Sequence, residues 1–239
     1  MREMTALAAF PITNRWPPQY PDRIQLYSLT TPNGVKISIA LEEMELAYEA
    51  HYVDFGKVDQ KSPEFRALNP NARIPAIIDP NGPNGKPLPL FESGAILLYL
   101  AEKSGKLLPS DPARRYETIQ WVFFQTSGVG PNFGQLGYFY KFAGREIEDK
   151  RPLERFRDET KRLLKVLDDR LADRTWVLGD EFTIADVAMI GPVRNLIEGY
   201  GARDLVQFDR LANVPAWLER SLARPAVARG LKIPAKPAS

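Results

Sequence analysis

Residues 29–34, with the sequence LTTPNG, combine polar side chains with residue types that end a strand and begin a helix. Pro32 and Gly34 interrupt the apolar pattern on either side, and Thr31 and Asn33 are suited to a helix N-terminus. Such a terminus attracts anions, because its first N–H groups have no partner inside the helix and its dipole is positive there. The hydroxyl of Thr31 and the amide of Asn33 are therefore candidate donors to a bound anion. The alternative is that both residues serve only as turn and cap residues.

The composition excludes several other kinds of site. The 239 residues include no cysteine and one histidine, His51, to which we assign no chemical role. The chain therefore has no disulfide framework, no cysteine nucleophile and no histidine cluster, and we expect no metal. A net charge of +2 and a pI of about 8.7 are too balanced to indicate nucleic acid or a membrane surface as a partner. No apolar run is long enough to span a bilayer, so a cytoplasmic enzyme or binding protein is the default expectation.

The elements that position the turn follow from hydrophobic periodicity. Residues 24–29 alternate like a strand. The segment after the turn fits both a strand and a helix face, but its length and the acidic residues at 42–45 favour a helix. The remaining apolar segments predict strands over 48–55, 74–78 and 88–91, a short helix from Pro63, and a buried helix over 93–103 that Gly105 ends. This order predicts an α/β domain with a mixed four-stranded sheet.

The second half of the chain is helical in pattern. Apolar side chains between Leu153 and Leu171 share one helix face, and a late helix that contains Trp217 stops before Pro225. Thr183 and Asp186 form a variant of the capping box, to which we assign a structural role. The expected boundaries are an N-terminal extension at 1–22, an α/β domain at 23–106, a linker at 107–113 and an all-helical domain at 114–239. The proline-rich extension shows no periodicity, so we expect an irregular segment whose aromatic residues dock on the body of the protein.

Three motifs identify a family to which this order of elements belongs. They are NARIPA at 71–76, FESGAILLYL at 91–100 and GDEFTIAD at 179–186. With these three motifs, the chain resembles the cytosolic glutathione S-transferases. This resemblance implies a thioredoxin-like N-terminal domain followed by an all-α domain. The TPNG turn, the Glu-Glu pair at 42–43, and the segments at 120–125 and 128–131 are similar to the nu class, which includes bacterial glutathione-dependent disulfide-bond oxidoreductases.

The resemblance implies a site for glutathione as co-substrate. Thr31 and Asn33 match the pair that contacts the glutathione sulfur, and Gln60 matches a side chain that reaches the glycyl end. In the same family pattern, the backbone of Ile74 clamps the cysteinyl residue, and Pro75 is a cis-proline. Glu92 and Ser93 hold the γ-glutamyl group. Arg73 stands where relatives often have lysine, and Arg155 matches an arginine of the helical domain that reaches the bound peptide. Phe133, Tyr138 and Tyr140 are expected to line the second-substrate pocket.

Each of these positions also has a simpler interpretation. Ser93 and Glu92 could only cap a helix and complement its dipole, and Pro75 could be an ordinary edge-strand proline. Gln60 and Arg155 lie in polar segments that could be solvated surface, and the aromatic side chains could pack in a core. The departure from the family pattern is the extension at 1–22, which could narrow the second-substrate pocket.

The resemblance implies an enzyme that activates the thiolate of bound glutathione. The cysteinyl thiol has a free pKa of about 8.5, and the thiolate is the nucleophile, so the site must lower that pKa. Glutathione can supply both sulfurs of a thiol–disulfide exchange, which suits a protein without cysteine. We therefore expect a glutathione-dependent disulfide reductase or transferase that forms a homodimer. The alternatives are a lyase that cleaves thioether or ether bonds of aromatic compounds, and a non-catalytic glutathione-binding module.

Overall fold

The computed structural model describes residues 6–237, so the first five residues of the expected extension and the last two of the chain lie outside it. The chain forms two compact units. The first contains the residues up to Ser104 together with those from Arg229 on, and the second is Gly105–Ala228. Each unit is described by itself.

The first unit is built on a mixed four-stranded sheet, as the sequence predicts. Its strands are β1 (Ile24–Ser28), β2 (Tyr48–Tyr52), β3 (Ala76–Asp79) and β4 (Leu88–Phe91), in the order β2-β1-β3-β4. β1 pairs in parallel with β2 and antiparallel with β3, which pairs antiparallel with β4. Two predicted boundaries were wrong: β2 ends at Tyr52 instead of residue 55, and β3 begins at Ala76 because Ile74 and Pro75 lie outside the strand pairing.

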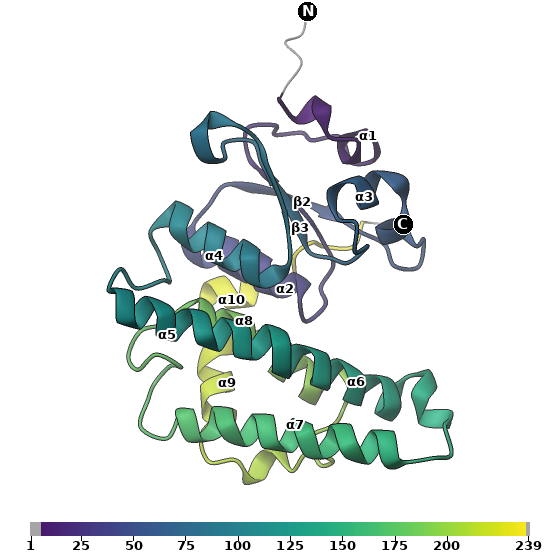
Figure 1. The fold of residues 1–239 in the computed structure, drawn as a ribbon, viewed down its shortest axis with the longest axis vertical. Coiled ribbons are helices and arrows are strands. Elements are labelled where there is room, and N and C mark those ends of the chain that lie inside the picture. Colours follow the sequence, from purple (N-terminus) through teal and green to yellow (C-terminus); the bar gives the residue numbers. More distant parts are fainter. Residues whose placement is uncertain (1–5, 238–239) are drawn as a thin grey trace, which may run out of the picture. The chain divides into compact units, whose positions relative to one another are not determined.

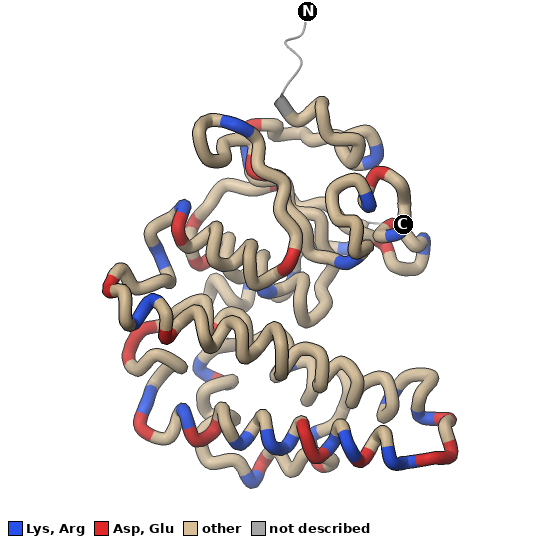
Figure 2. Tube along the Cα trace, in the orientation of Figure 1, with Lys and Arg blue, Asp and Glu red and all other residues tan. Residues whose placement is uncertain are grey.

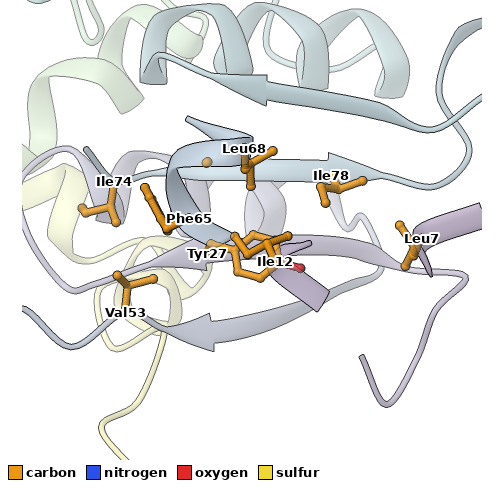
Figure 3. Close-up of a cluster of buried hydrophobic side chains, with 9 residues drawn as sticks. Leu7, Ile12, Tyr27, Val53, Phe65, Leu68, Ile74 and Ile78 are labelled. Carbon is orange, nitrogen blue, oxygen red and sulfur yellow. The ribbon is translucent and has the colours of Figure 1, made fainter. Parts of the chain in front are cut away.

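Helices cover both faces of this sheet, which explains why every residue of β1 is buried. α2 (Gly34–Met44) and α4 (Ser93–Ser104) contact each other and lie side by side in Figure 1. The ambiguous segment after the turn is thus a helix, and Glu45 ends it in the left-handed conformation, with φ 57°. The opposite face carries α3 (Pro63–Leu68), whose Phe65 and Leu68 pack in the cluster of Figure 3 with Tyr27 and Ile78 of the sheet.

The N-terminal extension is docked on this same cluster. Leu7 and Ile12 are buried in it (Figure 3). Phe10 and Trp16 pack against it, so the expected docking of aromatic residues is confirmed for these two. Trp16 Nε1 donates to the carbonyl of Tyr52 at 3.1 Å. The expectation of an irregular segment was wrong, because the extension contains a 3₁₀ turn (Ala6–Ala9) and the one-turn helix α1 (Ile12–Arg15). The physical reason is local burial, which compensates for weak helix propensity.

The second unit is helical. Its longer helices are α5 (Pro112–Phe123), α6 (Gly130–Lys141), α7 (Arg151–Arg170), α8 (Ile184–Arg194) and α9 (Val214–Leu222), with a π-helical turn at Phe124–Val129 between α5 and α6. α8 is its central helix, since it is buried from Ile184 to Val193. α10 (Pro225–Gly230) begins at the proline that was expected to follow the last helix. Figure 2 shows both signs of charge interspersed along α7.

The capping box at the start of α8 has the structural role that the sequence predicts. Asp186 accepts hydrogen bonds from the N–H groups of Val177 and Thr183, and from Nε1 of Trp217 at 3.0 Å. Complete burial raises the pKa of the Asp186 carboxyl to about 6. This carboxylate therefore holds together a loop, a helix start and α9.

Candidate functional site

A pocket with a volume of about 220 Å³ lies in the first unit, where the start of α2, the loop before β3 and the start of α4 meet. It is lined by Asn33, Asn69, Asn71, Arg73, Ile74, Pro75, Glu92 and Ser93. Six of these residues are positions that the sequence proposes for glutathione; Asn69 and Asn71 are not. Three segments that are distant along the chain are thus brought together by the sheet.

At the start of α2, the side chain of Thr31 caps the helix and the side chain of Asn33 does not. Thr31 caps the helix, because its Oγ1 accepts the N–H of Gly34 at 3.3 Å and its carbonyl accepts the N–H of Val35 at 3.0 Å. The Thr31 hydroxyl hydrogen remains to donate to another group. Asn33 makes no capping hydrogen bond, is exposed and lines the pocket, which argues against a role as a cap alone.

Gly34 is required at this turn for steric reasons. A Cβ atom at this position would lie 1.9 Å from the carbonyl oxygen of Leu29 and 2.6 Å from Oγ of Ser28. No side chain fits at that distance, so glycine lets the helix begin directly against the end of β1. This close approach fixes Thr31 and Asn33 at the edge of the sheet.

The loop before β3 is organised by Asn69. Its buried side chain donates to the carbonyl of Arg73 at 2.6 Å and accepts the N–H of Asn71 at 3.0 Å. Ala72 lies in the left-handed region with φ 54°, and the Ile74–Pro75 peptide bond is cis, as the resemblance implies. Ile74 lines the pocket and precedes the strand pairing of β3, so its backbone is available to pair with an extended ligand.

The junction of β4 and α4 supplies the third wall. Glu92 has φ 69°, an uncommon conformation for a residue other than glycine, and its exposed carboxylate lines the pocket. Ser93 is 7% exposed, and its Oγ accepts a hydrogen bond from Nζ of Lys36 at 3.2 Å. Lys36 is 1% exposed, and burial lowers its pKa from 10.5 to about 7, partly offset by the charge of Glu92.

The pocket offers complementary groups for an amino acid with both charges. Glu92 provides a negative charge, Arg73 a positive charge, and Ser93 with the N-terminus of α4 provides donors. Among residues 6–237, no three His, Cys, Asp or Glu side chains come close enough to hold a metal ion. This set of groups is suited to binding a zwitterionic peptide.

Gln60 is outside the lining of this pocket. It lies in a 3₁₀ turn (Asp59–Lys61), and its buried Oε1 has no hydrogen-bond partner within the described residues. The neighbouring Asp59 is held by an ion pair with Arg15 of the extension and by the N–H of Asp54 at 2.9 Å. The extension therefore fixes the turn that carries Gln60.

Comparison with known proteins identifies the family. The chain matches the N-terminal domain of glutathione S-transferases over residues 23–102 and their C-terminal domain over residues 151–220. This chain belongs to the glutathione S-transferase family. The disulfide-bond oxidoreductase YfcG of Escherichia coli is 43% identical over 209 residues, which cover 87% of this chain and 94% of YfcG.

Solved structures of this transferase family agree with the fold. A glutathione transferase from Burkholderia graminis, with two glutathione molecules bound per subunit, is 60% identical, with a TM-score of 0.97 and 99% of each chain covered. One from Pseudomonas putida, with one glutathione disulfide bound per subunit, is 62% identical, with a TM-score of 0.94, and the match covers 96% of this chain and 99% of the other. The expected fold, a thioredoxin-like domain followed by a helical domain, is confirmed, and so is an enzyme of this family.

The remaining candidate residues of the transferase lie in its helical unit. The Arg155 side chain is 72% exposed and forms an ion pair with Glu159, one helical turn away, at 3.7 Å. Phe133 is buried, whereas Tyr138 and Tyr140 are partly exposed, at 44% and 37%. Within their own unit, Phe133 is therefore a core residue, and the two tyrosines are the side chains with free surface.

Three residues of the site were missed by sequence reasoning: Asn69, Asn71 and Lys36. The Asn-Pro-Asn sequence at 69–71 is a turn signal, since asparagine side chains bond nearby backbone groups, and it could have indicated Asn69. Lys36 carries no such signal, because its burial depends on packing against α4.

None of the helices in the described part of the chain is long and apolar enough to cross a membrane.

Proposed function

We propose that this protein is a glutathione-dependent disulfide reductase of the nu class, with transferase activity, in which Thr31 and Asn33 activate the glutathione thiolate. The observation that carries the proposal is the start of α2. There, Asn33 lines a pocket suited to a zwitterionic peptide and makes no capping hydrogen bond. Thr31 is not part of the pocket lining, but it lies two residues before Asn33, and its hydroxyl already accepts one N–H. The family and the relatives named above support this function.

The binding roles follow the charges of the pocket. Glu92 pairs with the γ-glutamyl ammonium, and Ser93 donates to the γ-glutamyl carboxylate at the N-terminus of α4. The backbone of Ile74 pairs with the cysteinyl residue, with Pro75 fixing its direction. Arg73 and Gln60 serve the glycyl carboxylate, and Arg155 of the helical domain reaches the peptide. Tyr138 and Tyr140 are the proposed contacts of the second substrate, whereas the burial of Phe133 favours the alternative that it packs in the core.

The energy required of Thr31 and Asn33 is modest. Lowering the thiol pKa by about two units requires about 3 kcal/mol of preferential stabilisation of the thiolate. Hydrogen bonds to charged groups contribute about 1.5–3 kcal/mol each, so two donors at a helix N-terminus are sufficient. The protein itself needs no redox group and only holds the thiolate in a fixed place.

The proposed reaction uses two glutathione molecules and one substrate disulfide, and it yields glutathione disulfide and two substrate thiols. The first thiolate attacks one sulfur of the substrate disulfide and releases a substrate thiolate, which takes a proton. A second glutathione thiolate attacks the glutathione sulfur of the mixed disulfide and releases the other substrate thiolate. The sequence contains no cysteine, so all four sulfurs come from small molecules.

The test compares 2-hydroxyethyl disulfide reduction by wild type, Thr31→Val, Thr31→Ser and Asn33→Ala. We expect Thr31→Val and Asn33→Ala each to reduce kcat/KM about tenfold or more, whereas Thr31→Ser keeps a hydroxyl and most of the activity. The pKa of bound glutathione, measured by the ultraviolet absorbance of its thiolate, should rise in the two impaired variants.

Other outcomes favour the alternative functions. A wild type that binds glutathione but does not reduce disulfides, and that cleaves aromatic thioethers or ethers, would be a lyase. Glutathione binding without turnover of disulfides, thioethers or electrophiles would indicate a binding module.

We also propose a cytoplasmic homodimer. The resemblance implies contact between the α/β domain of one subunit and the helical domain of the other. Large apolar side chains are exposed in each unit, with Phe55 40% exposed in the first and Phe123 59% exposed in the second. Light scattering after size-exclusion chromatography should give twice the monomer mass, and Phe123→Ser should reduce it.

A further inference from the structure

Lys36 is a buried lysine next to the proposed glutathione pocket. It is the third residue of α2, only 1% exposed, and its Nζ lies 3.2 Å from Oγ of Ser93 at the start of α4. Lysine is almost never fully buried unless it is paired, because desolvation of the ammonium is unfavourable. Its place near the positive end of the α2 dipole is also unfavourable for a cation. A buried ammonium therefore needs partners, and the Ser93 hydroxyl is one of them.

The chemistry of an ammonium group sets the direction of the Ser93 hydroxyl. A protonated lysine has three donors and no acceptor, so Ser93 Oγ must be the acceptor in this hydrogen bond. The Ser93 hydrogen is then turned away from Lys36 and is left to donate elsewhere. Ser93 lines the pocket together with Glu92, so the pocket is the place where a ligand can accept that hydrogen.

We propose that Lys36 is a positioning residue that orients the Ser93 hydroxyl toward the α-carboxylate of the γ-glutamyl group of glutathione. The proposal deepens the proposed function and rests on it, because it requires glutathione in this pocket. Lys36 itself does not contact the ligand; it acts through Ser93.

The surrounding charges support this role. Burial favours the neutral form of Lys36 and lowers its pKa to about 7, whereas the negative charge of Glu92 favours the charged form. A ligand carboxylate next to Ser93 would add a second negative charge and would favour the ammonium further. Ligand binding and protonation of Lys36 are thus expected to support each other.

The test separates orientation of Ser93 from a structural role by changing both the residue and the ligand. Lys36→Met keeps a long side chain of similar volume without the charge or the donors, and Lys36→Gln keeps a donor to Ser93 without the charge. Lys86→Met, an exposed lysine outside the pocket lining, is the matched control. The ligands are glutathione and γ-aminobutyryl-cysteinylglycine, which lacks only the α-carboxylate. Calorimetry gives each dissociation constant at pH 6.5, and circular dichroism checks folding.

We expect Lys36→Met to weaken glutathione binding about tenfold and to leave binding of the aminobutyryl peptide unchanged. Lys36→Gln should recover most of the loss, and Lys86→Met should behave as wild type. In the Ser93→Ala background, Lys36→Met should have little further effect on glutathione binding, because the hydroxyl that it orients is absent.

Three results would overturn the role of Lys36 and leave the proposed function standing. They are unchanged glutathione binding by Lys36→Met, equal losses of affinity for the two ligands, and losses of affinity that add when Lys36→Met is combined with Ser93→Ala. A wild type that does not bind glutathione at all would overturn the proposed function and the role of Lys36 with it. The wild-type measurement therefore distinguishes the two failures.

Discussion

Two hydroxyl groups in this protein are arranged by the same principle. Oγ1 of Thr31 accepts the N–H of Gly34, and Oγ of Ser93 accepts a hydrogen bond from Lys36. A hydroxyl whose oxygen already accepts a hydrogen bond has its hydrogen directed away from that donor. Each of these residues is thereby prepared to donate to an anion: in our proposals, the thiolate for Thr31 and the γ-glutamyl carboxylate for Ser93.

At the residue scale, we predict how replacing Lys36 by methionine changes the free energy of unfolding and its dependence on pH. The folded-state pKa of Lys36 is about 7, and the value without burial is 10.5. Between these pH values the unfolded chain holds a proton that the folded chain lacks, so this group makes wild-type stability fall as the pH is lowered from about 10 to about 7. Below the folded-state pKa its contribution levels off.

We therefore expect Lys36→Met to be more stable than wild type at pH 7 by about 1–4 kcal/mol, with a difference that shrinks toward pH 10. Urea unfolding of both proteins at pH 7, 8.5 and 10 measures this difference in the free energy of unfolding. A difference that is independent of pH would show that the ammonium is not destabilised by burial.

At the element scale, α2 combines the parts of the site. Its start holds Thr31 and Asn33, its third residue is Lys36, and further along, Ser38 Oγ donates to the carbonyl of Gly230 at 2.6 Å. Glu42 forms an ion pair with Arg229 at 2.5 Å. Arg229 and Gly230 therefore help to fix the helix that carries the site, although they are distant in sequence.

The contact between the N-terminal extension and the Asp59 turn leads to a prediction at the element scale. Arg15 pairs with Asp59, which is largely buried and precedes Gln60. Arg15→Ala leaves that carboxylate without its cation, so we expect a loss of about 1 kcal/mol in the free energy of unfolding, discounted because the arginine is partly exposed. Faster hydrogen exchange should be confined to the loop at 54–61.

Arg23→Ala is the control for Arg15→Ala, because Arg23 lies over the ring of Tyr20 and is not paired with the Asp59 loop. If Gln60 binds the glycyl end, Arg15→Ala should also raise the KM for glutathione several-fold with little change in kcat. Unchanged exchange of the loop in Arg15→Ala would contradict a positioning role of the extension.

At the scale of the whole molecule, the absence of cysteine makes a direct prediction. Treatment with iodoacetamide in the absence of glutathione, followed by removal of the reagent, should leave disulfide reductase activity unchanged, because the chain has no thiol to alkylate. The same reagent present during the assay should abolish activity, because it consumes glutathione. Inactivation by pretreatment would indicate that another side chain of the protein is essential.

Much of the fold and part of the site were determined by local sequence. Alternation over 24–29, the turn at 29–34 and the capping box at 183–186 specify elements through nearby residues, and the structure contains all three. The sequence also excludes a cysteine nucleophile outright. The resemblance proposed Asn33, Glu92 and Ser93, because motifs keep residue types together, and the structure lines one pocket with them.

Only the tertiary structure decided how these parts meet. Lys36 and Ser93 are 57 residues apart, and helical periodicity cannot state which polar position a distant helix will bury. The extension gave no periodic signal, because its short helical turns are stabilised by Tyr27 and Phe65 beneath them and not by their own sequence. The sequence determined by itself most of the local elements and the fact that no cysteine of the chain can serve as a nucleophile. Long-range packing decided where the Ser93 hydroxyl hydrogen is directed, because its donor, Lys36, comes from another element.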